Sequence, residues 1–505
     1  MFHICFFLWL LFNLIILING NHFLGGTITW QPLNKSASGT PVAIVITQTY
    51  SWSTSYVKCN STQIANSELI STVLTYNGVS NTLDCIINCG SGSVGYIAPP
   101  IIPFCTDSSF KQGTVVGQRS DIVYLQQNDD FTVAFQDTGW RVLNGSSSNI
   151  WSLASRIAIQ PRSDNGLYNT APVATVMSPI NIPNNQTTVI TVPVGDADGD
   201  TTKCRWANGS NECGGVCPPG SLPPNTSIYP NCTIVITGQN VGDWFAVALM
   251  VEDFINSSST IPLSSVPIQF LVQVVTPPSC SIRPDIIGLP AEQSCIPVKV
   301  GETFNSQLIA INYCGASITI DDIATLSFSG MSKSAIIKFN STIYYKNLTW
   351  IPTSNQLGYQ VMCAMAINSQ SFQSTQYCFT FYVTIDGVND CPSDVYISTS
   401  TTTTTITTLT TNTATVTETT STSEITATTT TSETTATTTT TGTTATTTTT
   451  ATTTTSETTA TTTTSETTAT TTTTKTTAAT ITTSMPRKGL PSFMFGIVKV
   501  YLISY

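Results

Sequence analysis

The sequence predicts an all-β protein, in which tandem disulfide-stapled β-sandwich domains are followed by a disordered threonine-rich tail. Two observations carry this prediction. Short segments alternate apolar and polar residues between clusters of Gly, Pro, Asn and Ser, which is typical of half-buried antiparallel strands. Threonine then dominates residues 398–484, and a segment of that composition cannot bury a hydrophobic core. No convincing amphipathic helix follows the first 20 residues.

Residues 1–20 form an apolar run that ends at Gly20. Such a run at an N-terminus is typical of a secretory signal peptide, although the usual basic residues are missing here. Retention of the run as a membrane anchor is the alternative. We therefore expect a secreted or extracellular protein.

The segment from 21 to 391, called the head below, is long enough for three domains of ~100–150 residues. Breaks rich in Pro, Gly and Asn divide it into an N-terminal β-rich domain (21–168) and two sandwiches (169–277 and 278–391). Period-two alternation is clearest in segments that begin at Val42, Phe131, Ile190, Val266 and Phe379.

The chain has 15 cysteines, and those after Cys5 fall into three groups with even counts. Even groups in an oxidising compartment predict disulfides closed within each domain, although the partners within a group stay open. Zinc is the alternative at the two Cys-x3-Cys spacings, but no histidine lies near them. The groups are Cys59, Cys85, Cys89 and Cys105; Cys204, Cys213, Cys217 and Cys232; and Cys280, Cys295, Cys314, Cys363, Cys378 and Cys391.

Ten Asn-x-Ser/Thr sequons all precede the threonine-rich segment, which predicts an N-glycosylated head and an O-glycosylated, mucin-like stalk. The chain has 28 acidic and 18 basic residues without a basic cluster, so a nucleic-acid partner is not expected. The sequons are at Asn34, Asn60, Asn144, Asn185, Asn208, Asn225, Asn231, Asn256, Asn340 and Asn347.

The second and third predicted domains share a pattern. The segment 242–250, Gly-Asp-Trp-Phe-Ala-Val-Ala-Leu-Met, matches 358–365, Gly-Tyr-Gln-Val-Met-Cys-Ala-Met, with one insertion. A polar loop and an alternating strand follow each copy. Residues 171–391 therefore resemble cadherin-like and dystroglycan-type immunoglobulin-fold modules.

Asp196, Asp198 and Asp200 alternate around Gly199 and supply the oxygen ligands that Ca²⁺ prefers. The resemblance implies the same, because cadherin-like repeats carry an Asp-Ala-Asp element at a calcium-bridged linker. It further implies ligands at Asp164, at Asn165 or Asn169, and at Glu252 or Asp253. An acidic turn without a ligand is the alternative. The third domain has Asn312 and Asn368 at the corresponding places, and we expect no ion there.

Catalysis by histidine is not expected, because the only histidines are His3 and His22. No phosphate-binding loop is evident, and no carboxylate pair is clearly placed for a glycosidase. We expect no enzyme and no cofactor other than structural Ca²⁺. The four tryptophans of the first domain, Trp30, Trp52, Trp140 and Trp151, favour core packing over stacking on sugars.

The apolar tail 485–505 is interrupted by Lys499. A GPI-attachment signal is one interpretation of it; a spanning segment, plain secretion and a wrongly predicted final exon are the others.

Together these features predict an adhesion or recognition head on a glycosylated stalk, with an extracellular protein or glycan as its ligand. A lectin-like protein is the alternative, and a secreted glycoside hydrolase a weaker one.

Overall fold

The computed structural model describes residues 23–72, 82–144, 146, 150–388, 391 and 396–397, and the short segments 436–442 and 445–451. The signal peptide 1–20, the tail 485–505 and most of the threonine-rich stalk lie outside these residues. The described chain is almost entirely β, which confirms the predicted fold class. Its helices are short: α2 (Ser61–Ala65), α3 (Gly209–Cys213) and the 3-10 turn Ser354–Gln356.

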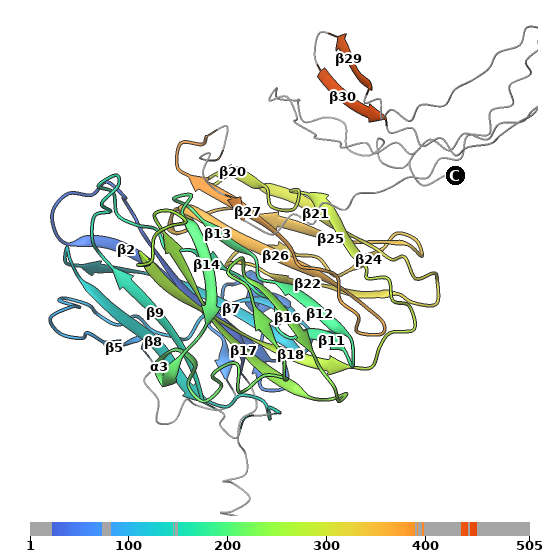
Figure 1. The fold of residues 1–505 in the computed structure, drawn as a ribbon, viewed down its shortest axis with the longest axis horizontal. Helices are drawn as coiled ribbons and strands as arrows, with labels where there is room; N and C mark the ends of the chain where they lie inside the picture. The colour runs from blue at the N-terminus through green and yellow to red at the C-terminus, as the bar shows by residue number, and fades with distance from the viewer. Residues whose placement is uncertain are drawn as a thin grey trace, which may run out of the picture. The chain divides into compact units, whose positions relative to one another are not determined.

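One 11-stranded sheet contains most of the strand residues between 23 and 275 (Figure 1). Its main path runs in the order β5-β8-β9-β18-β1-β2-β7-β6, and β11, β14 and β17 extend it from β18. The strands are β1 (Phe23–Pro32), β2 (Val42–Ser53), β5 (Asp84–Ile87), β6 (Phe104–Ser109), β7 (Thr114–Leu125), β8 (Asp130–Thr138), β9 (Ile150–Ala158), β11 (Ile180–Pro183), β14 (Thr201–Trp206), β17 (Trp244–Phe254) and β18 (Ser264–Val275).

Strand β18 joins the first two predicted domains. One edge pairs with β17 from Ser264 to Gln273, and the other edge meets β9, then β1, then β11. Gly25 lies opposite Phe270, so the N-terminal strand is hydrogen-bonded to a strand of the next predicted domain. The sheet and one hydrophobic core therefore continue across residue 168. The division at residues 168 and 277 stays a prediction.

Three small sheets contain the remaining strands of residues 23–275 together with β28. Two of them have the orders β10-β13-β28 and β12-β16-β15, and β3 pairs with β4. Their strands are β3 (Val57–Lys58), β4 (Ser71–Thr72), β10 (Val173–Ala174), β12 (Thr187–Thr191), β13 (Val194–Asp196), β15 (Ser227–Ile228), β16 (Thr233–Thr237) and β28 (Tyr396–Ile397).

Residues 285–384 form a sandwich of two sheets, with the orders β19-β21-β25-β23 (β24 also pairs with β25) and β20-β27-β26-β22. Below we call it the C-terminal sandwich. Its strands are β19 (Asp285–Leu289), β20 (Cys295–Lys299), β21 (Phe304–Ile311), β22 (Ile320–Leu326), β23 (Ser332–Lys333), β24 (Ile337–Lys338), β25 (Ile343–Trp350), β26 (Gly358–Asn368) and β27 (Tyr377–Thr384).

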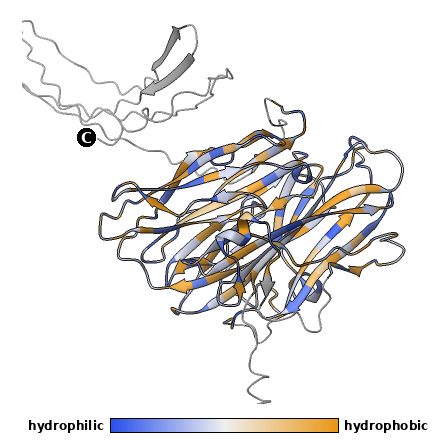
Figure 2. Cartoon of the chain, turned by 180° about the vertical axis from the view of Figure 1, so that it is seen from behind, coloured by the Kyte–Doolittle hydropathy of each residue, from blue (hydrophilic) through white to orange (hydrophobic). Residues whose placement is uncertain are grey.

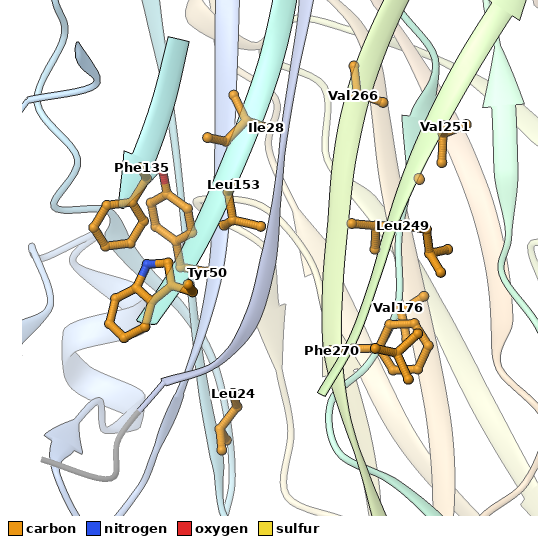
Figure 3. Close-up of a cluster of buried hydrophobic side chains, with 14 of the residues drawn as sticks. Leu24, Ile28, Tyr50, Phe135, Leu153, Val176, Leu249, Val251, Val266 and Phe270 are labelled. Atoms are coloured by element: carbon orange, nitrogen blue, oxygen red, sulfur yellow. The ribbon is translucent and has the colours of Figure 1, made fainter. Parts of the chain in front are cut away.

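Buried side chains follow the predicted alternation, and hydrophobic and hydrophilic residues alternate along many strands in Figure 2. Figure 3 shows Leu153 beside Ile28 in the main core, while Leu249 and Phe270 of strands β17 and β18 belong to the same buried cluster. The C-terminal sandwich has its own core around Trp350. A further buried cluster, in which Val116 and Met177 pack with Leu326 and Met365, joins the C-terminal sandwich to the main sheet, and residues 1–400 form one compact unit.

Seven disulfides join the cysteines of the described residues, and every bridge lies within its predicted group. The bridges are Cys59–Cys105, Cys85–Cys89, Cys204–Cys232, Cys213–Cys217, Cys280–Cys314, Cys295–Cys391 and Cys363–Cys378. The two Cys-x3-Cys spacings form disulfides, so the zinc alternative is wrong there.

The residues after 400 form a second unit. Within it, strands β29 (Ala436–Gly442) and β30 (Ala445–Ala451) pair in antiparallel register. Among the described residues, no helix is long and apolar enough to cross a membrane.

Candidate functional site

The acidic loop after β13 is held by one of its own carboxylates. Asp196 is the last residue of β13, and its Oδ1 accepts hydrogen bonds from the backbone N–H groups of Asp198 (2.8 Å) and Asp200 (3.1 Å). This arrangement folds the loop around Gly199, whose positive φ of 75° suits a residue without a side chain. The loop then leads into β14, which pairs with the end of β17.

Three carboxylates meet at this loop. Asp196, Asp200 and Asp253, the last from the end of β17, each place one oxygen within 4.8 Å of the others. Asp196 is 5% exposed and Asp253 is fully buried. The second oxygen of Asp196, Oδ2, is buried and has no hydrogen-bond partner among the described residues.

Asp253 is held firmly in place. Its Oδ1 accepts from the backbone N–H (2.6 Å) and the hydroxyl (2.8 Å) of Ser264, and its Oδ2 accepts from the side-chain amide of Asn169 (2.6 Å). These contacts tie β17, β18 and the segment before β10 to one carboxylate. We call Asp196, Asp200 and Asp253 the carboxylate cluster.

Two cationic side chains border the cluster. Arg162 donates to both oxygens of Asp200 and to Asp164, and Lys35 forms an ion pair with Asp198. Thr170 also donates its backbone N–H to Asp198 at 2.7 Å. Among the described residues, Arg162 and Lys35 form ion pairs with these carboxylates, and the charge of Arg156 also acts on Asp253. Asp164, Asp196, Asp198, Asp200 and Asp253 therefore outnumber the cations of the region.

The pKa values reflect this crowding. Burial, with the charges of Asp253 and Asp200, raises the pKa of Asp196 well above its usual value. Burial raises the pKa of Asp253 to about 6, against the hydrogen bonds from Asn169 and Ser264. Burial also raises the pKa of Asp200, although Arg162 opposes that shift. Like-charged carboxylates in a dry site favour either a shared proton or a bound cation.

The residues fit a hard divalent cation. All three cluster donors are carboxylate oxygens, which suit Ca²⁺ or Mg²⁺ better than softer metals. Asp196 Oδ2 is a buried carboxylate oxygen without a hydrogen-bond partner among the described residues, and a bound cation would satisfy it. Asp196, Asp200 and Asp253 are the side chains that would hold it.

The structure places the other predicted acidic ligands outside the carboxylate cluster. Asp198 binds Lys35 and Thr170, and Asp164 is a partly exposed partner of Arg162. Glu252 accepts from Arg205 at 2.9 Å, so it lies outside the cluster. Arg162 and Lys35 were not predicted at this site, since nothing in their spacing links them to a loop more than 30 residues away.

The tryptophans do not form a sugar-binding surface. All four of the first domain are at most 1% exposed, and three of them pack with Phe23 and Phe135 in an aromatic cluster. Core packing is therefore their role, and the stacking alternative is wrong. Of the ten sequon asparagines, nine are exposed and Asn347 is half-buried.

No protein-family model matches the chain, and no curated protein matches it in sequence. Solved structures that share features with it include the fibronectin(III)-like modules of CbhA from Clostridium thermocellum (13% identity, 42% of this chain, 94% of that chain, TM-score 0.16). They also include an endo-fucoidan hydrolase of glycoside hydrolase family 107 (14%, 56% and 37%, TM-score 0.15).

A third is the sialic acid binding region of a Streptococcus sanguinis SK1 adhesin (8% identity, 43% of this chain, 78% of that chain, TM-score 0.15). TM-scores this low do not establish a common fold.

Proposed function

We propose that this chain is an extracellular glycoprotein that presents an all-β recognition head on a threonine-rich stalk, and that the head binds Ca²⁺ at the carboxylate cluster as a structural ion. The role of the head is adhesion or recognition rather than catalysis. The single observation that carries the calcium site is the buried, unpartnered Oδ2 of Asp196.

The cysteines support the extracellular setting. Seven disulfides, each closed within its own part of the head, are stable only where thiols are oxidised. Exposed asparagines at nine of the ten sequons leave room for N-linked glycans on the folded head. The described residues contain no histidine, which agrees with a binding role but does not test catalysis by other residues.

Ca²⁺ at the cluster would link three parts of the fold. Asp196 ends β13, Asp200 precedes β14 and Asp253 lies near the end of β17, so one ion would fix two loops to the main sheet. It would also offset the negative charge that raises the pKa of Asp196. We therefore expect the ion to stabilise the head rather than to take part in a reaction.

The test is thermal unfolding of the full-length secreted protein in EGTA and in rising concentrations of CaCl₂. We expect a saturable rise in the melting temperature, equivalent to about 2.7 kcal/mol at 100 times the dissociation constant. Asp196→Asn should abolish the rise. The matched control is Glu252→Gln, a change at a neighbouring acid outside the cluster, which should leave the rise intact.

An unchanged melting temperature in saturating CaCl₂ would show that the cluster is an acidic turn without an ion. A separate measurement addresses adhesion: beads coated with the protein should aggregate in CaCl₂ and disperse in EGTA. Aggregation that is the same in CaCl₂ and in EGTA would show that adhesion does not depend on the metal site.

A further inference from the structure

Strand β12 is the outermost strand of a small sheet and has an open edge. The order of this sheet is β12-β16-β15, and β12 pairs with β16 from Thr187 to Thr191, over its whole length. Among the described residues, no strand pairs with the other edge of β12. Hydrogen bonds alternate along an antiparallel pair, and Val192 donates its backbone N–H to Cys232 at 3.0 Å. Thr187, Val189 and Thr191 therefore direct their backbone groups to the open edge.

The outer face of β12 and β16 consists of threonine and valine. Exposed side chains of β12 alternate with the buried Thr188 and Ile190, and Val189 is 62% exposed. Thr187 lies opposite Thr237, and their hydroxyl oxygens are 3.1 Å apart. The same face also contains Thr191, Thr233 and Val235. Threonine and valine favour strands, and nothing on this face repels a second strand.

Terminal strands elsewhere in the head are protected against such pairing. An unpaired row of backbone groups is a template for another chain, and natural proteins block it with charged residues, prolines or bulges. The terminal strands β5, β14, β19 and β20 contain Asp84, Lys203, Asp285 and Pro297. In contrast, β12 contains neither a charged residue nor a proline, and its register with β16 has no bulge. Its open edge therefore needs another form of protection.

Three sequons border this sheet. The strands β12, β15 and β16 each begin with the hydroxyl residue of an Asn-x-Ser/Thr sequon. The asparagines are Asn185, Asn225 and Asn231, and all three are exposed. Because β12 and β15 run antiparallel to β16, Asn185 and Asn225 lie at one end of the sheet and Asn231 lies at the other. Glycans on these asparagines would flank the sheet at both ends.

A glycan on Asn185 would stand at the start of the open edge itself. Strand β12 has five residues, so the edge is about 17 Å long. An N-linked oligosaccharide is bulky and strongly hydrated, and a second strand would have to displace it to reach the backbone of β12. The three sequons thus supply the protection that the residues of β12 lack.

From these observations we infer that N-linked glycans on Asn185, Asn225 and Asn231 shield the open edge of β12, and that the head without them self-associates by pairing β12 with β12 of a second copy. In the modification, the side-chain amide nitrogen of asparagine displaces a lipid diphosphate from the anomeric carbon of the donor oligosaccharide and loses one proton. This inference rests on the proposed extracellular glycoprotein and assigns a role to three of its glycans.

The experiment uses the full-length secreted protein. Mass spectrometry of its glycopeptides measures the occupancy of the three sequons, and we expect all three to be glycosylated. Light scattering during size-exclusion chromatography then gives the molar mass of the triple variant Asn185→Gln/Asn225→Gln/Asn231→Gln. We expect a molar mass about twice that of the native protein or more, rising with protein concentration.

The matched control is the triple variant Asn34→Gln/Asn256→Gln/Asn340→Gln. It removes three exposed sequons that lie outside the sheet of β12, and it should keep the oligomeric state of the native protein.

A further variant adds Val189→Lys to the first triple substitution. Because a lysine on an open edge opposes pairing with a second copy, this variant should return to the native oligomeric state. Melting temperatures identify a misfolded variant. If the first triple variant does not fold, the folded native protein is trimmed with an endoglycosidase that leaves one N-acetylglucosamine on each asparagine. The trimmed native protein should then associate, and trimmed Val189→Lys should not.

A folded triple variant that keeps the native oligomeric state would overturn the inference. So would association that Val189→Lys does not reverse, or equal association of the control variant. Empty sequons at Asn185, Asn225 and Asn231 beside occupied ones elsewhere would overturn the inference and leave the proposed glycoprotein intact. Absence of glycans from all ten sequons would contradict the proposed glycoprotein itself.

Discussion

Asp107 and Lys333 form a buried ion pair between two parts of the head that lie more than 200 residues apart in sequence. Lys333 Nζ lies 2.8 Å from Asp107 Oδ1, and the two side chains are 8% and 2% exposed. Thr325 and Ser327 also donate to Asp107. Burial raises the pKa of Asp107, but Lys333 outweighs burial and holds that pKa below its usual value. Asp107 is therefore ionised at neutral pH, and its charge opposes the burial that lowers the pKa of Lys333.

Breaking this pair should destabilise the docking of the C-terminal sandwich. Asp107→Ala leaves the Lys333 ammonium buried without its partner, and such a change costs about 3–5 kcal/mol. Urea unfolding should show the loss of free energy, and proteolysis should become faster in the segment 276–280 that joins the two parts.

The double variant Asp107→Leu/Lys333→Met is the control. It removes both charges, so no uncompensated charge remains, and its free energy of unfolding should lie closer to that of the native protein. A double variant as unstable as Asp107→Ala would show that packing, and not the charge pair, holds the sandwich.

The carboxylate cluster predicts an unusual dependence of stability on pH. Because burial raises the pKa of Asp253 to about 6 in the folded state, the native protein binds more protons than the unfolded chain between about pH 4 and pH 6. In EGTA the free energy of unfolding should therefore fall as the pH rises through this window. For Asp253 the fall is about 3 kcal/mol at most, since one pKa unit corresponds to about 1.4 kcal/mol.

Saturating Ca²⁺ should remove this fall, because the ion replaces the protons. Urea unfolding at pH 4.5 and pH 7, each with EGTA or CaCl₂, measures the change in the free energy of unfolding. In EGTA, Asp253→Asn should show a smaller decrease in that free energy than the native protein. A native protein in EGTA that gains stability from pH 4.5 to pH 7 would contradict the raised pKa values.

Gly25 is required where β1 meets β18. Its φ is +135°, and a Cβ at this position would lie 2.2 Å from the backbone carbonyl oxygen of Gln269. Gly25→Ala should therefore separate β1 from β18 and lower the melting temperature strongly. Gly166→Ala is the control: Gly166 also has a positive φ (+73°) but nothing within 4 Å, so only backbone strain of about 1–2 kcal/mol is expected. Equal melting temperatures for both variants would show that the strand contact is not tight.

The disulfides should differ in their effect on stability. Cys295–Cys391 closes a separation of 96 residues, and Cys213–Cys217 closes only 4. In the chain-entropy account, removing the long bridge by paired Cys→Ser substitutions costs about 4.7 kcal/mol and removing the short one about 2 kcal/mol. Denaturant unfolding of the two double variants measures the difference. A larger loss for the short bridge would indicate that native-state contacts at α3 outweigh the entropy of the unfolded chain.

The sequence predicted the strands because side-chain alternation is a local property. Phe131, Val133 and Phe135 alternate in the sequence and are buried together in β8. The cysteine groups were equally readable, because oxidation pairs whatever cysteines a folded unit contains. Asp196, Asp200 and Asp253 were predicted as ligands from spacing and from the resemblance, and they are the residues that the structure brings together.

Only the tertiary structure decided which side chains surround these carboxylates. Arg162 reaches Asp200 across 38 residues and Lys333 reaches Asp107 across 226 residues, and no sequence pattern encodes such pairs. The pairing of β1 with β18 arises in the same way. Composition and periodicity determine which face of a strand is buried, whereas the partners of a buried charge depend on how distant strands pack against each other.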